Sequence, residues 1–168
     1  MSNNLLVLCD PDRDQVEIAR IAARSGATIG LVSTAVRPQD MPAVGCRVEE
    51  VRDYGGVSVQ ALDEPLIAGA ALAQLSSFTD AVIVHHLGQW AERLTAHHIE
   101  SPERLDLELI SMGSVMNAGL TDVILVSTPM EEGRSAPLGA AAEQLHRRML
   151  EILGPYCAEV IDLSRAAR

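Results

Sequence analysis

Short apolar runs alternate along the chain with longer segments of helical periodicity, and this alternation limits the fold more than any other feature. Five such runs occur, at residues 5–9, 27–32, 80–84, 122–127 and 157–163. A run of this length bounded by turn signals is typical of a buried strand. Helices between consecutive strands give right-handed crossovers and parallel pairing. The sequence therefore predicts the α/β class, with an open, mostly parallel, Rossmann-like sheet of about five strands and helices on both faces.

Residues that cap or stop helices mark the segments between the runs. Gly26 closes the first predicted helix, and Asp63-Glu64-Pro65 begins the second, which continues through Leu75. Proline and acidic residues are favourable in a first helical turn. Three more helices are expected at about 87–97, 101–117 and 137–153. The polar stretch from Ser33 to about Gly56 is expected to be irregular.

The size and composition fit one domain, residues 1–168. The chain has 168 residues, of which 48% are apolar, but only one Trp, two Tyr and one Phe. It is long enough to bury one sizeable core and too short for two. That core has to be built from aliphatic side chains, which suits helices that cover a parallel sheet.

The net charge limits the kinds of partner that the protein can bind, and the cysteines indicate its compartment. A formal charge of −10 disfavours nucleic acid and anionic membrane surfaces, and all thirteen positive side chains are Arg. Cys9, Cys46 and Cys157 form no C-x-x-C pair, which argues against a disulfide framework or zinc ribbon. The N-terminus lacks a signal-peptide pattern. We expect a cytoplasmic protein with no nucleic-acid or membrane partner.

Polar residues follow the predicted strands, where ligands bind in open α/β sheets. Asp10 and His85 are the candidate catalytic residues at these strand ends. A small-molecule ligand would also meet polar groups on the same edge and its loops, which are the candidate binding residues Asp12, Ser33, Thr34, His86, Ser127, Thr128 and Arg134. Arg134 would supply charge for an anion and the hydroxyls would supply donors. No metal site or cofactor is predicted.

Each candidate also has a structural interpretation. Asp12 could cap the first helix, and Asp14 could complement its dipole. His85 and His86 alternate in direction, so they cannot easily serve one metal, and both could be structural or solvated. Residues 127–134 could form only a turn. The sequence alone leaves these alternatives open.

The middle of the chain resembles the adenosylcobinamide kinase / adenosylcobinamide-phosphate guanylyltransferase family. Residues 80–94, DAVIVHHLGQWAERL, are similar to the family's D-A-V-L-V-D-C-L-T-L-W segment without gaps, with Leu87 and Trp90 at matching positions. Residues 64–72, EPLIAGAAL, look like the family's E-P-L-D-L-A-A-A-L helix start, and Val126-Ser127 looks like the start of V-S-N-E-V-G. The resemblance implies a P-loop-NTPase-like layout and association of subunits into a homo-oligomer.

The positions that carry chemistry in that family are changed here. Its G-G-x-R-S-G-K-S loop cradles ATP phosphates, whereas this chain has Asp10-Pro-Asp-Arg-Asp14 and no Lys at all. Three carboxylates would repel a triphosphate. The family's Walker-B-like Asp falls on His85, and its guanylyl-accepting His falls on Val51. N-E-V-G becomes Thr128-Pro-Met-Glu131.

The resemblance and the changes together predict a divergent relative that has lost standard kinase and guanylyltransferase chemistry. Such a protein would act as a binding, regulatory or structural oligomeric subunit. The alternative is an enzyme whose active site has changed, acting on a small phosphorylated or corrin-related substrate through Asp10, His85 and Arg134. A receiver-like signalling domain is a third reading. It is weakened by His85, which stands where a phosphoacceptor Asp would be needed, and by the absence of Lys.

Overall fold

The computed structural model describes residues 3–9, 14–33, 58–63, 68–85, 87–96, 102–127 and 139–165. Its strands are β1 (Leu5–Leu8), β2 (Thr28–Ser33), β3 (Ser58–Asp63), β4 (Ala81–His85), β5 (Asp122–Ser127) and β6 (Glu159–Asp162). Its helices are α1 (Gln15–Ala23), α3 (Ala68–Ser76), α4 (Leu87–Ala96), α5 (Pro102–Ala118), α6 (Gly139–Leu153) and the short 3-10 helix η2 (Gly154–Tyr156).

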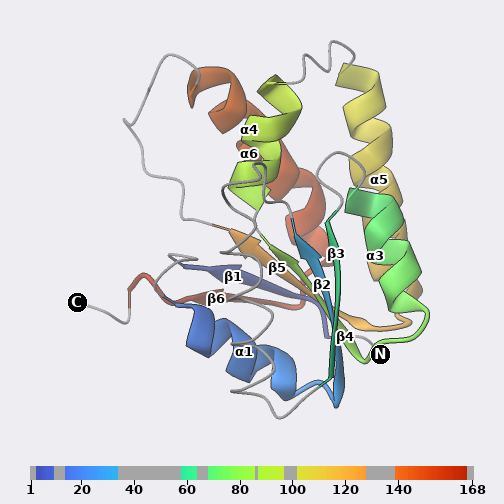
Figure 1. Cartoon of the computed structure of the whole chain (residues 1–168). Coiled ribbons are helices and arrows are strands. Elements are labelled where there is room, and N and C mark those ends of the chain that lie inside the picture. Colours follow the sequence, from blue (N-terminus) through green and yellow to red (C-terminus); the bar gives the residue numbers. More distant parts are fainter. Residues whose placement is uncertain are drawn as a thin grey trace.

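The six strands form one sheet in the order β3-β2-β4-β5-β1-β6, and every neighbouring pair is parallel. Figure 1 shows α1 on one face of the sheet and α3, α4, α5 and α6 on the other. The first crossover leads from β1 to β2 through α1, and the connections from β3 to β4, from β4 to β5 and from β5 to β6 run the opposite way across the sheet. A right-handed crossover has to change faces when its direction reverses.

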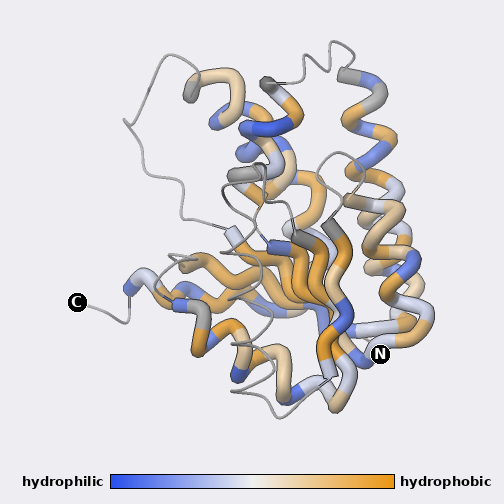
Figure 2. The backbone as a smooth tube through the Cα atoms, in the orientation of Figure 1, coloured by the Kyte–Doolittle hydropathy of each residue, from blue (hydrophilic) through white to orange (hydrophobic). Residues whose placement is uncertain are grey.

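Each face of the sheet carries its own apolar layer, because successive residues of a strand point to opposite sides. Leu6, Val84 and Leu125 belong to the layer under α3, α4, α5 and α6, and Val7 and Val126 to the layer under α1. Figure 2 shows the strands as apolar almost throughout, whereas the helices carry polar residues as well. β4 is buried along its whole length, as a central strand between two helical layers should be.

The predicted fold class is confirmed: this is an α/β protein with an open parallel sheet and helices on both faces. The sheet has one more strand than expected, β3. Its sequence SVQALD alternates, with Val59 buried and Gln60 and Ala61 exposed, because β3 has a single neighbour, β2, at the edge of the sheet. Asp63 was expected to begin a helix, which is wrong: it ends β3, and α3 begins at Ala68.

Two polar side chains fix the opposite end of the sheet. Asn4 donates from Nδ2 to the carbonyl oxygens of Met116 and Tyr156, and its Oδ1 accepts from the amide of Val123. A carboxylate oxygen of Asp80 accepts from the amides that begin β2. Asn4 is buried and its polar atoms are paired, as buried polar groups nearly always are, whereas Asp80 is exposed.

Over the part of the chain that the structure describes, no helix is both long enough and apolar enough to cross a membrane.

Candidate functional site

The carboxyl ends of β1 and β5 lie side by side, and the helices that follow them in the chain lie on opposite faces of the sheet. β1 continues to α1 on one face of the sheet, and β5 is followed along the chain by α6 on the other. The amide of Cys9 donates to the carbonyl oxygen of Ser127, so the two strand ends are joined at this point. Ligands of open α/β sheets bind outside such a topological switch point.

Three of the candidate residues from the sequence lie on this carboxyl edge. Ser33 is level with His85 in the pairing of β2 with β4, and His85 is level with Val126, directly before Ser127. The structure therefore brings Ser33, His85 and Ser127 onto one edge, as predicted. The other candidates lie outside the described residues: Asp10, Asp12, Thr34, His86, Thr128 and Arg134.

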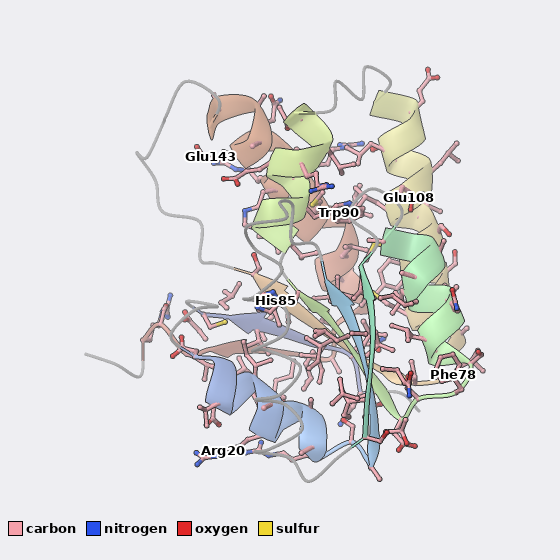
Figure 3. The ribbon with its side chains drawn as sticks, viewed as in Figure 1. Arg20, Phe78, His85, Trp90, Glu108 and Glu143 are labelled. Carbon is pink, nitrogen blue, oxygen red and sulfur yellow. The ribbon has the colours of Figure 1, made fainter. Side chains whose placement is uncertain are left out.

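His85 and Ser127 point to opposite faces of the sheet. His85 lies two residues after Ile83 in β4, so the two side chains point to the same face of the sheet, the face covered by α1. Cys9 belongs to the same apolar layer. Ser127 follows Leu125, whose side chain packs under the other helices. Both His85 and Ser127 are buried, and Figure 3 labels His85. One small group therefore cannot contact both side chains from the same side of the sheet.

Ser127 pairs with a residue that sequence reasoning did not select. Its Oγ lies 2.5 Å from Nε2 of His146, which is the middle residue of α6. Ser127 is 0% exposed and His146 is 6% exposed. Neighbours of His146 on the same side of α6, Ala142, Met149 and Leu153, are buried and hold the helix against the sheet. A hydroxyl and an imidazole thus meet at the end of β5, enclosed by apolar side chains.

Burial decides the charge of the imidazole. Desolvation lowers the pKa of His146 below its ordinary value of 6.5, and the negative charge of Glu143 raises it by a smaller amount. The ring is therefore neutral at physiological pH. A neutral imidazole has one nitrogen that donates and one that accepts, so Nε2 can accept the Ser127 hydroxyl proton when Nδ1 carries the ring proton.

Trp90 places a second polar group in the same helical layer. It lies on α4 (Figure 3), which packs against α6, and its side chain is fully buried. Its Nε1 has no hydrogen-bond partner among the residues that the structure describes. Buried donors in native proteins are nearly always paired, so an unpaired one calls for a water or ligand acceptor.

A hollow of about 480 Å³ lies along the outer side of α6. It is lined by Ala140, Glu143, Gln144, Arg147, Arg148 and Glu151. Arg147 pairs with Glu143 at 3.5 Å, and Arg148 makes two 2.8 Å bonds to Asp106 on α5. The arginines are thus engaged with carboxylates, and the bond to Arg148 lowers the pKa of Asp106. This surface ties α6 to its neighbour.

No cluster of His, Cys, Asp and Glu with metal-ligand geometry occurs within the seven described segments. Cys157 is a free thiol, and burial raises its pKa to about 11. A thiol with that pKa stays protonated at neutral pH and is a poor nucleophile.

The sequence carried a weak signal for His146. It stands in the predicted helix 137–153, three residues before Met149 and four after Ala142, on the apolar stripe of that helix. A histidine on an apolar stripe has to be buried, and buried polar groups need partners. The identity of that partner depends on how the helix packs, which the local sequence does not specify.

No protein-family model matches the chain, and no curated protein matches its sequence.

Proposed function

We propose that this chain is a divergent relative of the adenosylcobinamide kinase / guanylyltransferase family that binds a small molecule without ATP-dependent phosphoryl transfer. The ligand would bind at the carboxyl edge of the sheet, between β1 and β5. The observation that carries this proposal is the Ser127–His146 pair, because it places two polar side chains at the topological switch point. The protein would act as a binding or regulatory subunit.

The chemistry of the strand ends supports the loss of phosphoryl transfer. Mg²⁺ prefers oxygen ligands, yet β4 ends in a buried His85 that faces the α1 side. Phosphates also need positive charge close by. The residues that end the six strands are Leu8, Ser33, Asp63, His85, Ser127 and Asp162, which include two acids and neither Lys nor Arg.

The oligomeric part of the proposal is supported by an apolar stripe on α5. Leu107 and Ile110 lie one turn apart on this helix and are 68% and 52% exposed. Residues three apart on a helix share a face, so these two side chains form adjoining apolar surface. A subunit contact would remove that surface from water.

The proposal predicts how the protein responds to nucleotides. Titration calorimetry of the purified chain with Mg·ATP and with Mg·GTP should give no saturable heat, because acidic strand ends and a chain without Lys cannot compensate a triphosphate. The same titration without Mg²⁺ is the control. Saturable, Mg²⁺-dependent binding in the micromolar range would contradict the proposal.

An enzyme that acts on a small phosphorylated or corrin-related substrate is the second candidate. The burial of His85 at the end of the central strand favours it, since buried titratable groups at strand ends are common in active sites. The other two residues of this candidate, Asp10 and Arg134, lie outside the described residues. Turnover of such a substrate distinguishes it from the first candidate.

A further inference from the structure

The outward sides of α3 and α5 carry almost no charge. Residues 68–79 contain no charged side chain and residues 107–120 contain only one, whereas 21% of the whole chain is charged. The other α-helices that the structure describes each expose charge, namely Arg20 on α1, Glu92 on α4 and Arg147 on α6. The solvent side of a surface helix normally carries charged residues, so α3 and α5 differ from the other helices in this respect.

The two helices present one continuous surface. They pack side by side, as Figure 1 shows. The amide of Gly69 donates to a carboxylate oxygen of Glu108 at 3.2 Å, which pairs the single charged group of residues 107–120. Gly69 also allows close packing, because a Cβ there would lie 3.2 Å from Cγ of Met112. The exposed residues of 68–79 and 107–120 therefore form one surface, the α3–α5 face.

Four of the six large apolar side chains that are exposed within the described residues lie on the α3–α5 face. Leu107 and Ile110 are one turn apart on α5, and Phe78 and Leu120 follow the C-terminal ends of α3 and α5. The residues directly after Phe78 and Leu120 are joined by a 3.0 Å hydrogen bond, so these two side chains leave the backbone at neighbouring points. All four are more than half exposed. Apolar side chains gathered on one exposed face mark an interaction site.

Charge identifies a second copy of the chain as the partner that fits this face. Each copy carries a formal charge of −10, so two copies repel each other where their charged surfaces approach. Their repulsion is weakest where the surface is uncharged. A strongly charged partner would instead need opposite charges on the α3–α5 face. The face offers only Glu108, which is paired with a backbone amide.

The size of the α3–α5 face suits a small dimer. The 17 residues of α5 and the nine residues of α3 give helices about 26 Å and about 14 Å long. With neighbouring helices about 10 Å apart, the two cover about 400 Å² in projection. Protruding side chains make the accessible area larger than the projection, and a small stable interface needs about 600 Å² from each partner.

We infer that two copies of this chain form a symmetric dimer in which the α3–α5 face of one copy packs against the same face of the other. A contact between identical patches closes on itself and gives a two-fold axis. This inference rests on the proposed function, because it specifies the oligomer that the proposal contains. The contact surface includes no residue of β1 or β5, so dimer formation and ligand binding can be measured separately.

Sedimentation equilibrium of the purified chain, over a range of protein and NaCl concentrations, tests the inference. The wild type should have twice the mass of one chain at micromolar concentrations. Its dimer should tighten as NaCl is raised, because salt screens the repulsion between the two copies. Ile110→Glu places a carboxylate at the middle of α5 and should raise the dissociation constant of the dimer about 100-fold or more, since the contact would enclose two unpaired like charges.

Arg20→Gln provides the matched control. It changes the net charge by the same one unit as Ile110→Glu, but Arg20 is exposed on α1, which covers the other face of the sheet (Figure 3). The dissociation constant of this variant should equal that of the wild type. Urea unfolding followed through Trp90 emission verifies that each variant is folded. Glu is tolerated at position 110 in the monomer because Ile110 is exposed.

Four results would overturn the inference. They are a wild type that is monomeric at every concentration, an Ile110→Glu protein that dimerises as the wild type does, a dimer that dissociates as NaCl is raised, and a monomer that sediments with phosphatidylcholine vesicles, which would assign the face to lipid. A monomeric chain would leave the ligand-binding part of the proposed function standing. Conversely, saturable binding of Mg·ATP by a dimer would contradict the proposed function and leave this inference intact.

Discussion

His146 links the interior of the protein to its proposed site. It lies on the buried side of α6 and bonds to Ser127 at the end of β5. A single side chain thereby connects helix packing to the strand edge. The arrangement has an electrostatic cost, because the folded protein resists protonation of a ring that the unfolded chain protonates readily.

That cost predicts how stability depends on pH. The folded pKa of His146 lies below its ordinary value of 6.5, so its contribution is fully present above 6.5 and is lost as the pH falls toward the folded pKa. The unfolded chain then binds a proton that the folded chain does not. The free energy of unfolding, measured in urea through Trp90 emission, should fall more between about pH 7 and about pH 5 in the wild type than in His146→Gln.

Comparison of the two proteins isolates the histidine, because the carboxylates are the same in both. Asp106 and Asp162, whose pKa values are lowered, lose their contributions at more acidic pH. A constant difference in unfolding free energy between wild type and variant over the whole pH range would show that His146 does not titrate differently in the folded state.

The strands that the sequence predicts are those with a continuous apolar run. The runs that became β1, β2, β4 and β5 have apolar residues on both faces, and both faces are covered by helices. β3 escaped prediction because its residues do not form a continuous apolar run: the polar Gln60 interrupts the strand and is exposed. Its short pattern therefore looks like part of a loop.

The site divides in the same way. The placement of Ser127 and His85 on the carboxyl edge was predictable because each ends an apolar run, and parallel strands end at the same edge of a sheet. His146 was not, because its contact with Ser127 spans 19 residues and depends on the seating of α6. Asp10 and Arg134 stay predictions, since both lie outside the described residues.

The distance between α3 and the sheet depends on Gly30. A Cβ at this position of β2 would lie 3.1 Å from Cβ of Leu75 on α3 and 3.2 Å from Cγ2 of Val82 on β4. Neither neighbour can move freely, because Leu75 and Val82 are buried in the same apolar layer. Gly30 therefore allows the helix to pack closely on the sheet.

Substitution at Gly30 tests this packing. Gly30→Ala should lower the free energy of unfolding by about 1–3 kcal/mol, the usual cost of overpacking a core. Gly154→Ala is the matched control, because a Cβ there meets nothing within 4 Å, and it should change stability by less than about 1 kcal/mol. Urea unfolding followed by Trp90 emission measures both. If the free energy of unfolding of Gly30→Ala equalled that of the wild type, α3 would have room to move away from the sheet.

At the scale of the whole molecule, helices cover both faces of the sheet, and the polar residues Ser33, His85 and Ser127 lie at its carboxyl edge. At the amino ends of the strands, the side chains of Asn4 and Asp80 bond to strand and helix backbone. The chain carries a formal charge of −10, which disfavours anionic ligands. Topology and charge therefore favour a small, uncharged ligand at the switch point between β1 and β5.

Amide chemical-shift mapping tests this location most directly. The isotope-labelled chain is titrated with a library of small uncharged fragments. The Ser127→Ala variant is titrated in the same way for comparison. We predict that fragment-induced shifts concentrate at Cys9, Ser127 and His146 and weaken in the variant. Shifts concentrated instead at the outer strands β3 and β6, or unchanged by the Ser127→Ala substitution, would contradict a ligand site between β1 and β5.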